Sequence, residues 1–181
     1  MFYEKNNTID GFDEFVIKFP NSPDVSAAMT AMYALYAKNN TTDGYDEFVK
    51  KFPNSPEAST AITASYMLYK KENIIPGYRN FISKYPNTPE AYDAIQQIHI
   101  IAFSRAKKAS GFVALEEFQR AFPYAKQFEE AGKLAYQREL DGIKKRTKNG
   151  SDFDAVQRVS RLLRVQASQA EEVADYLIAD R

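Results

Sequence analysis

Apolar and polar positions along the first 140 residues follow a repeated pattern, which returns after 33 residues in three copies and after 37 residues in a fourth, longer copy. Residues 3–19 align without gaps on residues 36–52, and residues 69–85 keep many of the same positions. Each copy ends in an aromatic residue followed by proline, and a degenerate fourth copy does the same; these prolines are Pro20, Pro53, Pro86 and Pro123. A fixed period of this size indicates one small structural unit stacked several times.

Within each unit the pattern predicts two antiparallel α-helices. The first helix is expected to begin where a hydroxyl residue precedes proline, at Ser22-Pro23, Ser55-Pro56 and Thr88-Pro89. Its apolar residues recur at helical spacing, and Asn39-Asn40 and Asn73 are expected to end it. The second helix carries an aromatic stripe and must end at the next aromatic-proline pair, because proline disfavours helical geometry in the residue before it.

These repeats resemble the tetratricopeptide repeat, and within it the repeats of bacterial envelope proteins. The resemblance rests on the aromatic residue late in the first helix, Tyr33 and Tyr66, and on the closing prolines. It covers roughly residues 1–140. It implies an all-α fold, a right-handed α-solenoid of helix pairs that presents a concave surface to other proteins.

The two ends of the chain depart from the repeat. Residues 3–7 match the tail of a first helix whose body is missing, so we expect a fragment of a longer protein or an end covered by another chain, with self-association through the open end as one form of the latter. Residues 126–148 read as one long helix that stops at Asn149-Gly150. Further helices begin at Ser151 and at Ser168, where Glu171 completes a capping box.

The sequence therefore predicts a repeat array over residues 1–140, with a truncated first unit, and a C-terminal helical cap over residues 141–181. Apolar residues of the last, acidic helix are expected to face the array: Val173, Tyr176, Leu177 and Ile178. Because Gly150 is a flexible joint, the cap could instead dock on another protein.

Candidate chemistry is sparse. The chain has no cysteine and one histidine, His99, so zinc sites and Cys-His or Ser-His-Asp constellations are excluded. His99 takes the place of Tyr33 and Tyr66 in the repeat and is expected to pack. The acidic residues of the second helices, such as Asp13 and Asp46, are expected to form a solvated face favoured by the helix dipole. We predict no catalytic, cofactor-binding or metal-binding residue.

The sequence favours a non-catalytic scaffold that binds a partner polypeptide. The hypothesised contact residues lie on the first helices and are Ala31, Tyr33, Ala64, Tyr66, Gln97 and His99. A basic patch in the cap is the second candidate for recognition, and it consists of Arg158, Arg161 and Arg164. Balanced charge, with 24 basic and 24 acidic residues, does not favour nucleic acid or anionic membrane as a partner.

An alternative function is a regulatory or sensor module of a larger bacterial protein, with a catalytic domain or membrane anchor elsewhere. Residues 1–5 lack an apolar signal region, and the longest apolar stretch, residues 98–103, is too short to cross a bilayer. The sequence as it stands predicts a cytoplasmic location, and a periplasmic or envelope location if the chain extends upstream. Membrane attachment would require a segment that is absent here.

Overall fold

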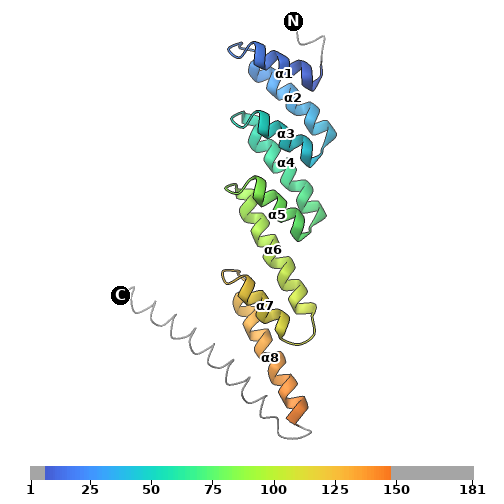
Figure 1. The fold of residues 1–181 in the computed structure, drawn as a ribbon, viewed down its shortest axis with the longest axis vertical. Coiled ribbons are helices and arrows are strands. Elements are labelled where there is room, and N and C mark those ends of the chain that lie inside the picture. Colours follow the sequence, from blue (N-terminus) through green and yellow to red (C-terminus); the bar gives the residue numbers. More distant parts are fainter. Residues whose placement is uncertain (1–6, 148–181) are drawn as a thin grey trace, which may run out of the picture. The chain divides into compact units, whose positions relative to one another are not determined.

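The computed structural model describes residues 7–147, and all regular structure in that range is helical. Eight α-helices and no strand lie in these residues, which confirms the all-α class. In chain order the helices are α1 (Ile9–Lys18), α2 (Val25–Asn39), α3 (Thr42–Lys51), α4 (Pro56–Glu72), α5 (Ile75–Lys84), α6 (Pro89–Lys108), α7 (Val113–Ala121) and α8 (Phe128–Thr147) (Figure 1).

The chain divides into two compact units within α6, one up to Ile98 and one from His99 onward. The boundary that we predicted after residue 140 falls inside α8, which is continuous there and packs against α7. The long helix after Pro123 is therefore one continuous element that packs against α7.

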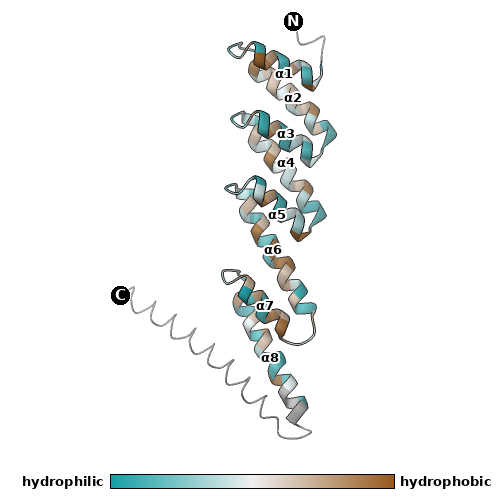
Figure 2. Ribbon diagram, viewed as in Figure 1, coloured by the Kyte–Doolittle hydropathy of each residue, from teal (hydrophilic) through white to brown (hydrophobic). Residues whose placement is uncertain are grey.

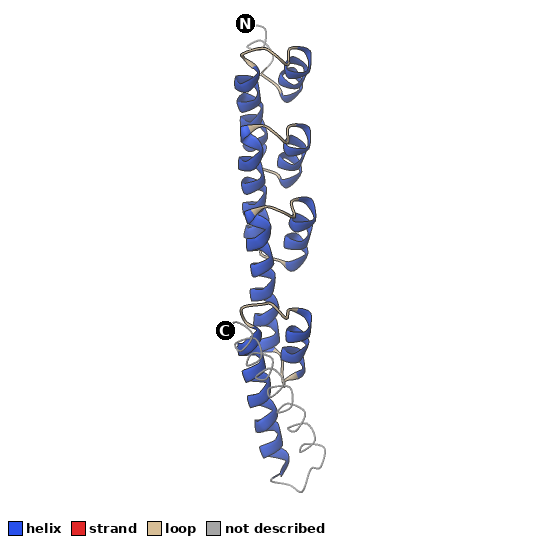
Figure 3. Ribbon diagram, turned by 90° about the vertical axis from the view of Figure 1, so that its left-hand side faces the viewer, coloured by secondary structure: helices blue, strands red, loops and turns tan. Residues whose placement is uncertain are grey.

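In the first unit, shorter and longer helices alternate. The shorter helices α1, α3 and α5 lie to one side of α2, α4 and the first half of α6 (Figure 3). Helix α2 packs against α1, α3 and α4, and α4 packs in turn against α3 and α5. Helices α2 and α4 therefore contact each other as well as the shorter helices on either side of them.

The ends of the second helices follow the sequence prediction. Helices α1, α3 and α5 each stop one residue before the aromatic-proline step. The capping residues Phe19, Phe52 and Tyr85 have φ of −131°, −129° and −131°, outside the helical region. Each still donates its backbone N–H to the carbonyl four residues earlier, so the last turn is closed before proline ends the helix.

Threonine caps begin two of these helices. The Oγ1 atoms of Thr8 and Thr41 accept a hydrogen bond from the backbone N–H of Gly11 and Gly44, both at 3.1 Å. This is the usual N-cap bond, and it satisfies one of the free donors at the helix start. In the third copy Ile74 takes this place, and α5 begins without a side-chain cap.

The first helices begin less uniformly than predicted. Helix α4 begins at Pro56 as expected, but the hydroxyl of Ser55 makes no cap bond. Helix α2 begins only at Val25, since Ser22 and Asp24 form a turn in which Ser22 Oγ accepts from Asp24 N at 3.3 Å. The hydroxyl cap holds only at Thr88, whose Oγ1 accepts from Ala91 N at 3.2 Å.

Two asparagines end the first helices, as predicted. Asn40 and Asn73 adopt left-handed conformations with φ of 47° and 52°, which asparagine tolerates better than most residues. Their side chains are held in place, because Asn40 Oδ1 accepts from Tyr45 Oη at 3.0 Å and Asn73 Oδ1 accepts from Tyr78 Oη at 3.1 Å. The same hydrogen bond thus fixes the turn after α2 and the turn after α4.

Aromatic rings form the core of each pair. Phe48 is 0 % exposed, and its ring centroid lies 5.5 Å from that of Tyr33, 5.8 Å from Tyr36 and 5.6 Å from Phe52. The equivalent Phe81 repeats this arrangement with Tyr66, Tyr69 and Tyr85 at 5.1, 5.8 and 5.2 Å. Such tilted and edge-on rings pack favourably beyond the area they bury.

Two aspartates of the second helices form ion pairs with lysines of the next helix pair. Lys51 Nζ lies 3.0 Å from Asp13 Oδ2, and Lys84 repeats the pair with Asp46. The carboxyl of Asp46 also accepts from Tyr85 Oη at 2.6 Å and from the buried Ser65 Oγ at 3.4 Å. Asp13 and Asp46 therefore link successive helix pairs, which corrects the expectation that they only face solvent.

The second unit contains the end of α6 together with α7 and α8. Its core is formed by small and apolar side chains, among them Phe103, Ala106, Leu115, Phe118, Ala131 and Ala135. We expected the extra residues of this copy between the two helices, around residues 107–113. Helix α6 runs to Lys108 and α7 begins at Val113, so the loop between them lies within this range. The loop contains Gly111 with φ of 76°.

Arg138 on α8 closes the end of α6. Its guanidinium donates to the carbonyl oxygens of Lys107, Ala109 and Gly111 at 2.6, 2.9 and 2.8 Å, and more weakly to that of Ala106. The last carbonyls of a helix lack partners within the helix, and a cation is favoured there by the helix dipole. One side chain from α8 thereby fixes both the helix end and the loop.

The helices predicted to begin at Ser151 and Ser168 lie outside the described residues. The same holds for the basic patch Arg158, Arg161 and Arg164, and for the first six residues of the chain.

Candidate functional site

The residues predicted to face a partner on α2 are only partly exposed. Ala31 and Tyr33 are half-buried and pack against the core of the first unit. The ring of Tyr33 lies against Phe48 and has its centroid 6.4 Å from that of Tyr45. Burial also raises the pKa of Tyr33. Much of this tyrosine therefore serves packing between α2 and α3.

Tyr66, predicted as an anchor on α4, is an interior residue. It is 3 % exposed, and its ring packs on Phe81 and on Tyr78, whose centroid lies 6.3 Å away. Its hydroxyl donates a hydrogen bond to Asp93 of α6. Burial first, and this bond second, raise the pKa of Tyr66. The ring is consequently not available to a partner on the surface of the folded chain.

Gln97 belongs to the same hydrogen-bonded group as Tyr66. Asp93 accepts from Gln97 Nε2 at 3.4 Å, from Lys70 Nζ at 2.9 Å and from the hydroxyl of Tyr66. The Tyr66 bond, followed by the Lys70 bond, lowers the pKa of Asp93. Asp93 thus joins α4 to the first half of α6. Ala64, the remaining predicted residue of this unit, is half-buried against the core.

His99 lies in the second unit and packs against Phe122. The ring centroids are 5.0 Å apart, which is the packing role expected from its place in the repeat. Its Nδ1 is buried and has no hydrogen-bond partner among the described residues. Burial lowers the pKa of His99, because the charged imidazolium is disfavoured away from water.

The side chains that solvent reaches on the first helices are neighbours of the predicted ones. We give the name first-helix face to seven of these exposed residues in the first unit: Ser26, Thr30, Ala34, Ser59, Thr60, Met67 and Tyr92. Ala27, Lys38 and Lys70 are among the other exposed residues of these helices. Most residues of the first-helix face are small or polar. Met67 and Tyr92 are the exceptions, with exposed fractions of 56 % and 64 %.

Two hydroxyl-carboxylate bonds connect the first helices along this face. The hydroxyl of Thr30 donates a hydrogen bond to the carboxylate of Glu57. One repeat later, the hydroxyl of Thr63 donates in the same way to the carboxylate of Glu90. Sequence reasoning missed these bonds, although threonine and glutamate recur together at a constant separation of 27 residues. That recurrence is the signal that could have placed Thr30, and not Ala31, at the contact between α2 and α4.

A shallow cleft of about 370 Å³ lies where the start of α2 meets the loop between α3 and α4. Its apolar lining includes Val25, Met29, Phe52 and Pro53. The cleft offers apolar contact area without a convergent set of titratable groups, which fits binding better than catalysis.

Within residues 7–147, no group of three or more histidine, cysteine or acidic side chains could hold a metal ion. None of the described helices is both long and apolar enough to cross a membrane, and hydropathy changes from residue to residue along them (Figure 2).

Comparison with known protein-family models and with curated proteins gives no match to this chain.

Proposed function

We propose that the chain is a non-catalytic scaffold, a right-handed α-solenoid of tetratricopeptide-like helix pairs, and that a partner polypeptide binds its first-helix face. The observation that carries this proposal is the exposure of Met67 and Tyr92 on a surface otherwise formed by small and polar side chains. Large apolar side chains that are exposed together on one surface are typical of contact sites, whereas single exposed ones are ordinary.

The chemistry of the two residues suits partner contact. Methionine adapts to irregular apolar surfaces, and tyrosine offers a large rigid area with a polar tip at low cost in side-chain entropy. Both types are enriched at the centres of protein interfaces.

The support beneath these residues is rigid. Met67 follows Tyr66 in the chain and Tyr92 precedes Asp93, so the two exposed side chains flank the hydrogen bond that joins α4 to α6. The ion pair of Lys70 with Asp93 reinforces that bond. A surface held in this way loses little conformational freedom when a partner binds. Ala31, Ala64 and Tyr33 are half-buried and pack against the core below this surface.

The solenoid part of the proposal is supported by the recurrence of the same structural details. Helix ends at Phe19, Phe52 and Tyr85, turns at Asn40 and Asn73, and ion pairs of Lys51 and Lys84 repeat with the 33-residue period. Units that meet through the same contacts each time tend to stack with a constant rotation, which generates a superhelix.

The test is affinity capture from the cells in which the protein is made, followed by mass spectrometry. The variant Met67→Lys/Tyr92→Lys removes the exposed apolar area, and Lys50→Glu/Arg79→Glu is a matched control on the exposed sides of α3 and α5. Circular dichroism must first show that both variants are folded. We expect a defined set of proteins to be lost from the first variant and retained by the control.

If both variants retain the same captured proteins, or if only the control loses them, the partner binds another surface. If the captured proteins are lost only when Arg158, Arg161 and Arg164 are substituted, the partner binds the basic patch.

A further inference from the structure

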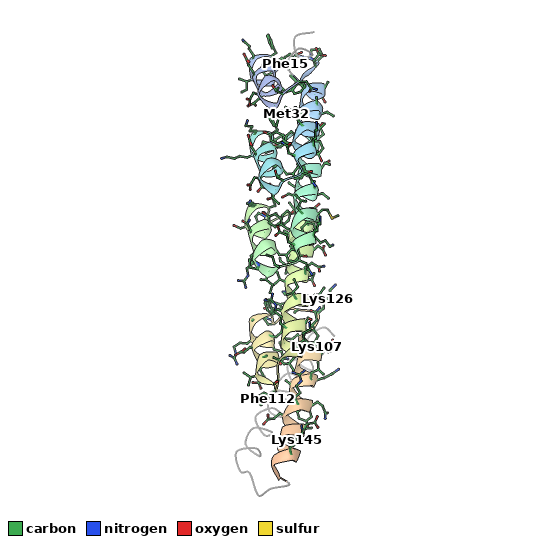
Figure 4. The ribbon with its side chains drawn as sticks, turned by 90° about the vertical axis from the view of Figure 1, so that its right-hand side faces the viewer. Phe15, Met32, Lys107, Phe112, Lys126 and Lys145 are labelled. Atoms are coloured by element: carbon green, nitrogen blue, oxygen red, sulfur yellow. The ribbon has the colours of Figure 1, made fainter. Side chains whose placement is uncertain are left out.

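The second unit carries a shallow cleft of about 330 Å³ along one side of α6. Five of its lining residues lie on that helix at helical spacing, and the sixth, Gln127, directly precedes α8; the six are Ile100, Phe103, Ser104, Lys107, Lys108 and Gln127. Figure 4 shows the labelled Lys107 toward the α6 side of this unit, whereas Phe112 lies toward α7.

The chemistry of the lining defines what would fit the cleft. Ile100 is 47 % exposed. The ammonium of Lys107 lies 5.0 Å from the centre of the Phe103 ring and is already paired with Glu130 Oε1 at 3.0 Å. Lys108 is exposed on the same helix, and Lys126 is exposed next to Gln127. An occupant should therefore combine apolar side chains with carboxylates.

Gln127 adds a more specific requirement. Its Oε1 atom is buried and accepts no hydrogen bond from any described residue. Buried polar atoms in folded proteins are nearly always hydrogen-bonded, so a donor on the occupant would satisfy this acceptor.

We propose that residues 168–181 of the same chain bind in this cleft. This segment carries four carboxylates, Glu171, Glu172, Asp175 and Asp180, and the apolar residues Val173, Tyr176, Leu177 and Ile178. The Tyr176 hydroxyl is a donor that can serve Gln127. The acidic groups of the segment thus complement Lys108 and the nearby Lys126, and its apolar groups complement the apolar lining of the cleft.

The chain is long enough for this return. Helix α8 starts directly after Gln127 and has 20 residues, so its far end lies about 30 Å from the cleft at ~1.5 Å per residue. Residues 148–167 cover about that distance even as a continuous helix, and about twice as much when extended. A tethered segment also has an effective concentration on the order of millimolar, which favours it over a second copy of the chain.

A disulfide trapping experiment on the full chain tests the proposal, because the protein has no cysteine of its own. Ser104→Cys/Val173→Cys places one thiol in the cleft and one on the segment. Glu117→Cys/Val173→Cys is the matched control, with its first thiol exposed on α7. Under mild oxidation, we expect an intramolecular disulfide to form at least tenfold faster in the first pair than in the control.

Charge reversal provides the second arm. Lys108→Glu in the Ser104→Cys/Val173→Cys background should slow trapping several-fold, and adding Glu172→Lys should restore the rate. Equal rates in the two cysteine pairs would overturn the proposal. A disulfide that forms only between chains would also overturn it and assign the cleft to a second copy. Neither arm uses an external partner, so the result is independent of the scaffold proposal.

Discussion

Lys51 Nζ lies 3.0 Å from Asp13 Oδ2, and 33 residues later Lys84 makes the same contact with Asp46. Both pairs join residues 38 positions apart on successive second helices. Such partly exposed ion pairs contribute little stability individually. Their recurrence is informative in another way, since it means that consecutive helix pairs meet through interchangeable surfaces.

Because consecutive helix pairs meet through interchangeable surfaces, we predict that one 33-residue repeat can be removed. Excision of residues 20–52 joins Phe19 to Pro53 and brings Asp13 opposite Lys84. We expect this protein to keep its helical content per residue and to unfold cooperatively at a lower temperature, because the stability of an array is roughly the sum of its units and their interfaces. Far-UV circular dichroism during heating measures both. Excision of residues 20–49 is the out-of-register control, and similar behaviour of the two proteins would contradict the prediction.

The aromatic core predicts a strong contrast on one helix. Phe48→Ala should lower the free energy of unfolding by about 3–5 kcal/mol, since it removes a fully buried ring and leaves a cavity. Lys50→Ala changes an exposed position of the same helix and should stay within about 0.5 kcal/mol of the wild type. Denaturant titrations give both values, and equal losses would show that the helix faces have been misassigned.

Two buried tyrosines should respond differently to loss of the hydroxyl. Tyr66→Phe removes a hydrogen bond to the carboxylate of Asp93 and should cost about 1.5 kcal/mol. Tyr36 Oη is buried without a hydrogen bond of good geometry, although Glu47 lies close enough to contribute to its raised pKa. Tyr36→Phe should therefore be nearly neutral at pH 7, within about 0.5 kcal/mol.

Tyr36 should also make stability depend on alkaline pH. Burial, with Glu47 as the next cause, raises its pKa from 10.0 to about 12 in the folded chain. The folded state thus keeps the proton longer than the unfolded state. The resulting stabilisation is fully present below the unfolded pKa and is lost as the pH rises from 10.0 toward about 12. The free energy of unfolding of wild type should fall more steeply across this range than that of Tyr36→Phe. Parallel curves would contradict the assignment.

His99 should destabilise the second unit in mild acid. Burial lowers its pKa from 6.5, so the unfolded chain takes up a proton at a higher pH than the folded one. Stability from this residue is present above the unfolded pKa and is lost as the pH falls below it. His99→Tyr, which restores the residue of Tyr33 and Tyr66, should flatten that loss in denaturant titrations at neutral and mildly acidic pH. An unchanged slope would assign the acid sensitivity to other groups.

Arg138 should control the order of the loop after α6. Arg138→Met keeps much of the length of the side chain but leaves the carbonyls of Lys107, Ala109 and Gly111 without their donor. We expect faster amide hydrogen exchange at the end of α6 and around Gly111. Gln137→Met on the exposed side of α8 is the control and should leave exchange there unchanged.

The sequence predicted the class of fold and most helix ends because both depend on local chemistry. The proline after Phe52 and the asparagine at position 73 act within one or two residues of where they stand. The contact surface was harder to predict. A broad apolar stripe shows which side of α4 is buried, but not whether its edge residue Tyr66 faces α5 or solvent.

Long-range polar contacts were also beyond the sequence. The bond of Thr30 to Glu57 is visible only when the second copy, Thr63 with Glu90, is compared with it. Arg138 has no counterpart in the earlier units, so no internal comparison could reveal its role as a helix cap. Its partners lie 27 to 32 positions away along the chain.

The Asp46 contact also bears on how such a chain evolves. Duplication of a 33-residue segment copies both halves of every contact, so a new unit meets its neighbour with a complementary surface from the outset. Later changes then have to be compatible across that surface. Where Phe52 and Met32 stand in one unit, Tyr85 and Ser65 stand in the next, and both new hydroxyls donate to the same carboxylate. In the third copy Arg79 stands where Asp13 and Asp46 stand in the earlier copies. Asn80 beside it replaces Glu47 and donates to Tyr69 Oη at 2.9 Å. The repeated ion pair between an aspartate and a lysine of the next copy therefore ends at Arg79, where the acid is lost.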